Sequence, residues 1–465
     1  MNIKKILSDK KRKIRDLCLS IGATAVLNIV IQFALYPYLE RNLGEEKYGV
    51  ALSILSLVAI LAGTLGTSAN YSRMVVSTDV EHSNGDYNLL LLVSSAICGV
   101  CGIFYLRYLG IVTVFPAVLF VVLTILTALR YYSDVGFRMK ADFVRYMLYY
   151  VMISVGYLIG MTVYRMSGEW MTALIVGEAF GILFVVFFGT IYRKSVLKPS
   201  KNFSLVVKSM GFLVLSTLIE NLTLNADRLL LMVLSGGVAV TVYYVASLFG
   251  KVVAMLSVPI NSIIISYLVK YEGGLTRKFW TVAISAISAL GAIAFGGCVL
   301  VSPFFLKVLY PDVYPEAARY IAPAILGQIF YFTSGILLVI LLRFRGEKKQ
   351  FFFNLGYLGE FVIIVFVGTW QGGLDGFVYA SLVANAIRFF AVILWGYLPP
   401  RKEKILQAGP EKQNGSELSE SFYCFEYLES HRVFCVVAFG DYSVLFACES
   451  DRYKGILGCA LFGCG

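Results

Sequence analysis

Charged residues are scarce in this sequence. They make up 15% of its 465 residues, whereas 58% are hydrophobic and the mean hydropathy is +0.76. A soluble domain needs a more polar surface than this composition allows, so the chain is expected to be a membrane protein. The formal charge of +11 does not indicate a nucleic-acid partner, because Lys and Arg are spread over many short segments and no RNA- or DNA-binding motif is present.

Catalytic groups and energy-coupling motifs are also missing. The two histidines are His82, in an expected cytoplasmic loop, and His431, near the C-terminus. No Walker Gly-Lys-Ser/Thr loop occurs, which excludes ATP as a direct energy source within this chain. The sequence therefore indicates a protein that is not an enzyme and carries no cofactor.

The cysteines predict neither a disulfide framework nor a metal site. Four of them fall in or beside apolar runs, where a thiol usually packs as a small residue: Cys18, Cys98, Cys101 and Cys298. The other five follow Pro399-Pro400 and are spaced too widely for a zinc knuckle: Cys424, Cys435, Cys448, Cys459 and Cys464. We expect residues 399–465 to be a separate, poorly ordered cytoplasmic tail.

Long hydrophobic runs dominate the rest of the chain. A bilayer core about 30 Å thick needs about 20 mostly apolar residues per helix, and twelve runs meet this length. They cover residues 17–39, 48–69, 88–106, 110–129, 146–164, 170–192, 210–234, 239–268, 279–301, 320–342, 351–369 and 376–398. The first run follows a basic start and is long enough to span, so we expect a retained helix rather than a cleaved signal peptide.

The basic residues outside these runs give the orientation. With the N-terminus inside, that side collects 27 Lys and Arg residues and the opposite side only 6. Because cytoplasmic loops carry the excess of Lys and Arg, an even number of spans with both termini cytoplasmic is expected. The outer connections are short, the longest running from Ser302 to about Arg319, so they offer no extracytoplasmic domain for chemistry.

A weak internal repeat suggests two halves. Residues 168–178 of the sixth run and 376–385 of the twelfth carry small residues and a polar group at similar spacing. Such duplication is common in secondary transporters, although chance similarity between two apolar helices is an equal alternative. The predicted fold is an all-α polytopic membrane protein of about twelve helices in two pseudo-symmetric six-helix bundles. The predicted divisions are a basic cytoplasmic N-terminus (1–16), an N-terminal six-helix bundle (17–200), a C-terminal six-helix bundle (201–398) and the tail (399–465).

Ionisable side chains inside the runs are candidates for function, since each is costly in a bilayer. Seven stand well inside: Glu178, Glu220, Asp227, Arg228, Lys251, Glu360 and Arg388. On a helical wheel of the seventh run, six polar residues share one face: Thr217, Glu220, Asn221, Asn225, Asp227 and Arg228. This face is expected to meet either a wet cavity or a hydrogen-bonded seam with another helix, and six polar groups favour the cavity.

Two further runs deliver a cation to mid-depth. Lys251 follows Tyr244 and Ser247 on one face of the eighth run, and Arg388 follows Asn385 on one face of the twelfth. Such cations can bind a pyrophosphate or an acidic sugar, and desolvated carboxylates can exchange protons with a driving gradient. The alternative is internal ion pairing, such as Glu220 with Lys251 or Glu360 with Arg388, and the sequence leaves both open.

Three segments resemble the Wzx-type polysaccharide flippases of the MOP exporter superfamily. The first is Arg41-Asn-Leu-Gly-Glu-Glu-Lys-Tyr-Gly49 between the first two runs. The second is Asn225-Ala-Asp-Arg228, followed by Tyr243-Tyr-Val-Ala246 and Pro259-Ile. The third is Tyr310-Pro-Asp-Val-Tyr-Pro-Glu-Ala317. The resemblance covers residues 10–398 and identifies the superfamily better than the substrate.

The resemblance implies transport of undecaprenyl-pyrophosphate-linked sugar repeat units across the bacterial inner membrane. It also implies coupling to an ion or proton gradient, with membrane lipid, a polysaccharide polymerase and a chain-length regulator as partners. The expected substrate-binding residues are Arg228, Lys251, Arg388, Asn221, Asn225 and Asn385. The expected ion-coupling residues are Glu220, Asp227, Glu360 and Glu178.

Three other readings stay open at this stage. One is export of another cargo, either a lipid-linked peptidoglycan precursor or a drug. Another is a glycan polymerase or ligase, which would normally need catalytic groups in an outer loop. The last is a purely structural membrane protein, which would not explain seven buried ionisable groups.

Overall fold

The computed structural model describes most of the chain. The described residues are 3–76, 83–193, 195–255, 260, 261, 264, 265, 268, 271, 273–398, 432–439 and 442–449. The predicted loop position of His82 and the cysteines at 424, 459 and 464 lie outside them. No group of three or more His, Cys, Asp or Glu side chains that could hold a metal occurs in this part of the chain.

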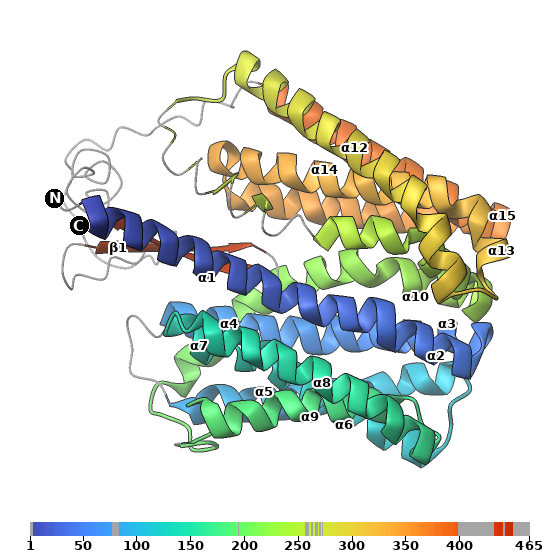
Figure 1. The fold of residues 1–465 in the computed structure, drawn as a ribbon, viewed down its shortest axis with the longest axis horizontal. Coiled ribbons are helices and arrows are strands. Elements are labelled where there is room, and N and C mark those ends of the chain that lie inside the picture. Colours follow the sequence, from blue (N-terminus) through green and yellow to red (C-terminus); the bar gives the residue numbers. More distant parts are fainter. Residues whose placement is uncertain are drawn as a thin grey trace, which may run out of the picture.

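Helices account for nearly all of the described chain (Figure 1). The first half contains α1 (Ile3–Val30), η1 (Ile31–Leu35), α2 (Tyr36–Leu43), α3 (Glu45–Val58), η2 (Ala59–Gly63), α4 (Thr64–Val76), α5 (Asn84–Tyr108), α6 (Val114–Ser133), α7 (Val135–Met139), α8 (Phe143–Ser167) and α9 (Met171–Phe188). The rest contains α10 (Phe203–Met255), α12 (Arg277–Leu309), α13 (Tyr314–Ala317), η3 (Ala318–Tyr320), α14 (Ile321–Arg345) and α15 (Glu347–Tyr397).

Ten helical stretches of the described residues are long and apolar enough to cross a membrane, and glycines divide two of them. Helix α10 has 53 residues and α15 has 51, so an unbroken helix of either length would reach about 80 Å at 1.5 Å per residue. Gly236 interrupts α10 with φ 84°, and Gly373 interrupts α15 with φ 54°. A side chain with a Cβ rarely adopts such angles, so glycine permits a tight turn here. Helices α10 and α15 therefore supply two spans each, and the ten stretches together contain the predicted twelve spans.

The helices form two groups (Figure 1). The first group contains α1 to α9, and the first arm of α10, residues 203–235, packs along α3, η2 and α4 of this group. The second group contains the second arm of α10, residues 237–255, with α12, α14 and α15. A transmembrane bundle satisfies its backbone inside each helix, so side chains decide which helices pair. The chain is a multi-pass membrane protein.

Among the described residues, the two groups share a hydrophobic core in the half of the bundle that the expected orientation places outside. One cluster of buried residues runs through the first group and continues to Tyr310, Ile325 and Phe377 at the outer end of the second. A separate cluster around Trp280, Phe332 and Phe389 fills the inner end of the second group. The shared core therefore joins the two groups at their outer ends, whereas the inner end of the second group has a separate core.

The internal repeat has a structural counterpart. Helix α9 crosses α8 where Ala173 meets Gly160. The second arm of α15, residues 374–397, crosses the first arm, residues 347–371, where Ala380 meets Gly368. In each pair a tyrosine donates a hydrogen bond of 2.8 Å to the polar residue that the repeat singled out, and these bonds are Tyr157 to Glu178 and Tyr357 to Asn385. The same contact recurs in both halves, which favours duplication over chance similarity.

Two strands lie in the tail. Strands β1 (Arg432–Phe439) and β2 (Tyr442–Glu449) pair as an antiparallel hairpin, with Arg432 opposite Glu449. The hairpin lies in the tail, outside the membrane part, for which the predicted all-α polytopic fold is confirmed. The predicted lack of order in the tail stays a prediction.

Candidate functional site

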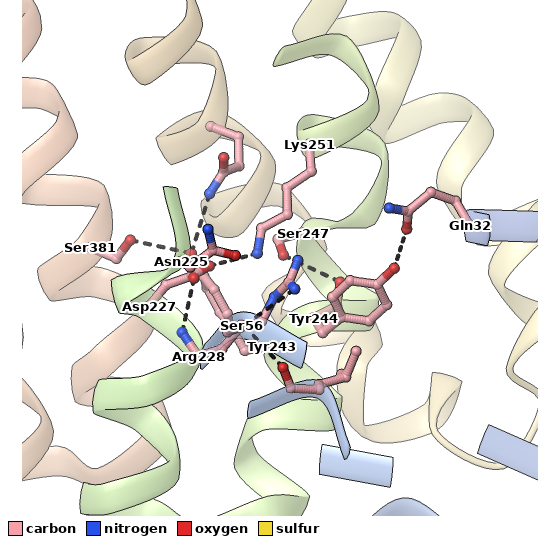
Figure 2. A network of polar contacts seen from close by, with 12 residues as sticks. Gln32, Ser56, Asn225, Asp227, Arg228, Tyr243, Tyr244, Ser247, Lys251 and Ser381 are labelled. Atoms are coloured by element: carbon pink, nitrogen blue, oxygen red, sulfur yellow. Dashed lines mark hydrogen bonds and ion pairs between the residues drawn. The ribbon is translucent and has the colours of Figure 1, made fainter. Parts of the chain in front are cut away.

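The cationic cluster consists of Asp227, Arg228 and Lys251, which the two arms of α10 bring together (Figure 2). Lys251 Nζ lies 2.6 Å from Asp227 Oδ2, and both side chains are largely buried. Asp227 Oδ1 also accepts a hydrogen bond of 2.8 Å from the backbone N–H of Arg228. Two cations surround one carboxylate, so the cluster keeps one net positive charge.

The turn at Gly236 explains how these residues meet. Asp227 lies nine residues before Gly236 and Lys251 lies fifteen after it, a difference of about 9 Å in depth at 1.5 Å per residue. Helical side chains lean toward the N-terminus of their own helix, which for the second arm is the turn. The long Lys251 side chain therefore reaches back toward Asp227, as Figure 2 shows.

Aromatic rings flank the cluster. The Arg228 guanidinium carbon lies 5.1 Å from the ring centroid of Tyr244, and Lys251 Nζ lies 5.8 Å from the same centroid. Lys251 Nζ is also 5.7 Å from the Tyr243 centroid. Arg228 Nη1 donates to Ser56 Oγ at 3.4 Å. Ring faces stabilise cations without neutralising their charge, so an anion can still be attracted to the cluster.

Arg388 forms a second cationic centre at a comparable depth. It lies fifteen residues after Gly373, as Lys251 does after Gly236. Its guanidinium carbon lies between two rings, 4.2 Å from the Tyr331 centroid and 4.4 Å from the Tyr357 centroid. Only 5% of Arg388 is exposed, and its Nε and Nη1 have no hydrogen-bond partner in the part of the chain that the structure describes. A buried guanidinium with unused donors favours an anionic ligand.

Polar side chains connect the two centres. Tyr243 and Ser381 are joined by a hydrogen bond of 3.3 Å between their hydroxyls. Asn385, one turn after Ser381, accepts from Tyr357, the ring that covers Arg388. The cationic cluster and Arg388 therefore belong to one polar region where the two groups meet.

The polar face of the first arm is divided between a seam and the cluster. Thr217 and Ser68 share a hydrogen bond of 2.6 Å, and Asn221 lies against Gly63. Asn225 donates to the backbone oxygen of Asn221 at 2.9 Å. Thr217 therefore forms the hydrogen-bonded seam that the sequence left as an alternative, whereas Asp227 and Arg228 form the cluster, and the substrate-binding roles of Asn221 and Asn225 stay predictions. The predicted wet cavity and the ion-coupling role of Glu220 stay predictions.

The ion pairs differ from those that the sequence suggested. Lys251 pairs with Asp227, two helical turns from the suggested Glu220. Glu360 and Arg388 form no ion pair among the described residues, and Glu360 Oε1 is buried without a hydrogen-bond partner. Glu178 pairs with Arg130, whose Nε lies 2.8 Å from Glu178 Oε2.

Arg130 is a buried charge that the sequence analysis missed. The predicted fourth run ends at residue 129, so Arg130 was counted as a loop residue, whereas α6 continues to Ser133. Its side chain is 11% exposed. The signal that could have found it is the spacing of Thr127 and Arg130, three residues apart on one helical face. Both contact Glu178.

Tyrosines close the outer end of the bundle. The ring of Tyr48 packs on Tyr244 and Tyr310, with centroid distances of 6.2 and 6.4 Å. Burial raises the pKa of Tyr310, so its hydroxyl stays protonated and uncharged at neutral pH. Thr241 Oγ1 donates to the backbone oxygen of Glu45 at 2.7 Å. We call these contacts, with the close approach of Gly49 and Gly237, the outer closure.

Comparisons with known proteins give the class of fold. No known protein family and no curated protein matches the sequence. Solved structures match it. A MATE transporter in complex with MaD5 is 14% identical with a TM-score of 0.58, and the match covers 83% of this chain and 95% of that one. The bent form of the Vibrio cholerae MATE transporter VcmN is 13% identical with a TM-score of 0.56, over 83% and 95%.

A third match is a multidrug resistance MATE family transporter of the MOP superfamily in its inward-facing conformation. It is 14% identical with a TM-score of 0.55, over 82% of this chain and 93% of that chain. The chain therefore has the two-group helical fold of the MATE transporters of the MOP superfamily. This confirms the fold that the sequence resemblance implied.

Proposed function

We propose that this protein is a flippase for lipid-linked oligosaccharides. It moves undecaprenyl-pyrophosphate-linked repeat units from the cytoplasmic to the outer face of the bacterial inner membrane. The observation that carries the proposal is the unneutralised positive charge where the two groups meet. Arg388 has unused donors, and the cationic cluster surrounds one carboxylate with two cations. A diphosphate supplies the charge and the oxygen acceptors that these donors need.

The resembling sequence segments support the proposal through their positions. Tyr48 of the first segment, Tyr244 of the second and Tyr310 of the third meet in the outer closure. Asp227 and Arg228 of the second segment form the cationic cluster. The segments that suggest a flippase are therefore the ones that build the closure and the site beneath it.

The shared core in the outer half fits a state that opens to the cytoplasm. The diphosphate head group would enter between the two groups while the lipid tail stays in the bilayer. Rocking of one group against the other then opens the outer end, which is the alternating access expected for a duplicated transporter. Glu360 and Glu220 are two of the proposed ion-coupling carboxylates.

Drug export is the competing transporter function, since the matching structures include a multidrug resistance transporter in its inward-facing and outward-facing conformations. A cationic drug would meet like charge at Arg388 and at the cationic cluster, which costs binding energy. An anionic cargo is attracted by the same charges, which adds to its binding energy. The charge of the site therefore favours a diphosphate cargo over an organic cation.

Deletion of the gene in its host tests the proposal. We expect oligosaccharide repeat units to accumulate on the cytoplasmic face of the inner membrane, with restoration by the wild-type gene and not by Arg388→Gln. Arg319→Gln, which changes an exposed arginine on the outer side, is the matched control and should restore transport. Single repeat units that reach the outer face without polymerisation would instead identify a polymerase. Unchanged glycans together with sensitivity to cationic drugs would identify a drug exporter.

A further inference from the structure

Tyr244 lies between the cationic cluster and the first group of helices (Figure 2). The face of its ring is near Arg228 and Lys251, at 5.1 and 5.8 Å from the centroid. Its hydroxyl donates a hydrogen bond to Gln32 Oε1 of η1. Tyr244 is fully buried, so neither contact is shared with solvent.

The same ring packs against two tyrosines of the first group. Its centroid is 5.8 Å from that of Tyr36 and 6.2 Å from that of Tyr48, both in edge-on arrangements. Tyr36 and Tyr48 also contact each other, at 6.4 Å. Tyr244 therefore contacts the cationic cluster and also belongs to the outer closure.

The neighbouring Tyr243 provides an internal comparison. Its ring lies 5.7 Å from Lys251 Nζ, at nearly the same distance as the ring of Tyr244. Its other described contacts are with Ser381, Gln328 and Phe377, all in the second group. Two adjacent tyrosines thus cover the same cation, and of the two only Tyr244 has described contacts with the first group.

We propose that Tyr244 couples occupancy of the cationic cluster to the outer closure. An anionic diphosphate that draws Arg228 and Lys251 away from the ring face removes part of what holds Tyr244 against Tyr36 and Tyr48. The closed outer end then loses stability relative to the open one, and cargo binding shifts the population outward. The inference rests on the proposed function and adds to it the residue through which the cargo acts.

The test uses spin labels on the full-length protein in lipid nanodiscs. Its nine cysteines are replaced, and Cys is introduced for Met166 at the end of α8 and for Trp370 at the end of the first arm of α15. Both positions are exposed, at 84% and 77%, and both lie at the expected outer side. The distance distribution between the labels reports whether the outer end is open.

The probe is undecaprenyl diphosphate, whose binding is measured separately with radiolabelled lipid. In the wild type we expect it to raise the ratio of open to closed molecules by about tenfold or more. Tyr244→Leu should bind the probe within about threefold of the wild-type affinity but shift this ratio by less than about twofold. Tyr243→Leu, the matched control, should keep most of the shift.

Each failure has a different meaning. A wild type that does not bind the probe contradicts the proposed function, and the coupling role is lost with it. Binding without a shift, or a full shift in Tyr244→Leu, overturns the coupling role alone. An equal loss of the shift in Tyr243→Leu also overturns it, since general damage to the site would then explain both variants. If Tyr244→Leu does not fold, Tyr36→Leu removes the opposite side of the same contact and must also abolish the shift.

Discussion

Lys251 Nζ lies 2.6 Å from Asp227 Oδ2, although the two residues belong to different arms of α10 and both are largely buried. Buried ion pairs contribute little net stability when intact, because desolvation offsets the attraction. Removal of one partner leaves a buried charge uncompensated. The main effect of the pair is therefore to hold the Lys251 side chain in place, and its contribution to the stability of the fold is small.

We expect Asp227→Ala to lower the free energy of unfolding by about 3–5 kcal/mol, because it leaves Lys251 buried beside Arg228 without a carboxylate. The double variant Asp227→Ala/Lys251→Ala should lose less than the sum of the single variants, with a coupling energy of about 1–3 kcal/mol. Reversible unfolding in mixed micelles measures these values. Additive single effects would contradict the pairing.

Arg388→Gln should reduce transport without reducing stability. The guanidinium has unused donors in a buried position, so its replacement removes no ion pair of the described structure. Loss of hydrogen bonds from a charged group to the cargo costs about 1.5–3 kcal/mol, which corresponds to a transport rate about ten- to a hundredfold lower. The melting temperature should stay unchanged or rise. A lower melting temperature with unchanged transport per folded molecule would assign Arg388 to the scaffold instead.

Glu178→Ala should destabilise the first group of helices. It removes the carboxylate paired with Arg130 at 2.8 Å and the acceptor of the Tyr157 hydroxyl. The expected loss is about 3–5 kcal/mol, as for other broken buried pairs. Transport by the remaining folded protein should keep its dependence on pH. A stable variant whose transport no longer responds to pH would instead support the ion-coupling role that the sequence analysis assigned to Glu178.

Gly49→Ala should open the outer end. A Cβ at position 49 would overlap the backbone oxygen of Gly237 in the closed arrangement, and helix backbones have little room to yield. Overpacking of about 1–3 kcal/mol shifts the closed-to-open ratio by roughly five- to a hundredfold. The labels at positions 166 and 370 report the shift. Gly335→Ala, where a Cβ meets nothing, is the matched control. Equal distributions in the two variants would show that this contact does not determine closure.

The number of spans could be predicted because it depends on local properties. Each run of apolar residues fixes its own helix, and the glycines at 236 and 372–373 mark turns within continuous apolar sequence. The excess of Lys and Arg on one side sets the expected orientation in the same local way. The pattern of apolar and polar residues also indicated which face of the seventh span is polar.

The partners across helices could not be predicted. Glu220 and Asp227 lie about 10 Å apart along the same helix. The stagger of α10, meaning the offset of its second arm along the axis of the first, decides which of these two residues meets Lys251. That stagger depends on the turn at Gly236 and on the reach of the lysine side chain. Arg130 was missed for a related reason, since hydropathy marks where apolar sequence ends rather than where a helix ends.

The short turns at Gly236 and at Gly372–Gly373 also have a consequence for biosynthesis. Almost no polar chain has to be carried across the bilayer between the two arms of α10, or between those of α15. Each pair of arms can therefore enter the membrane from the cytoplasmic side as one hairpin, with its backbone groups already satisfied. An insertion of polar residues at either glycine would make translocation costly, so reporter tags at these two turns are expected to lower the amount of protein in the membrane.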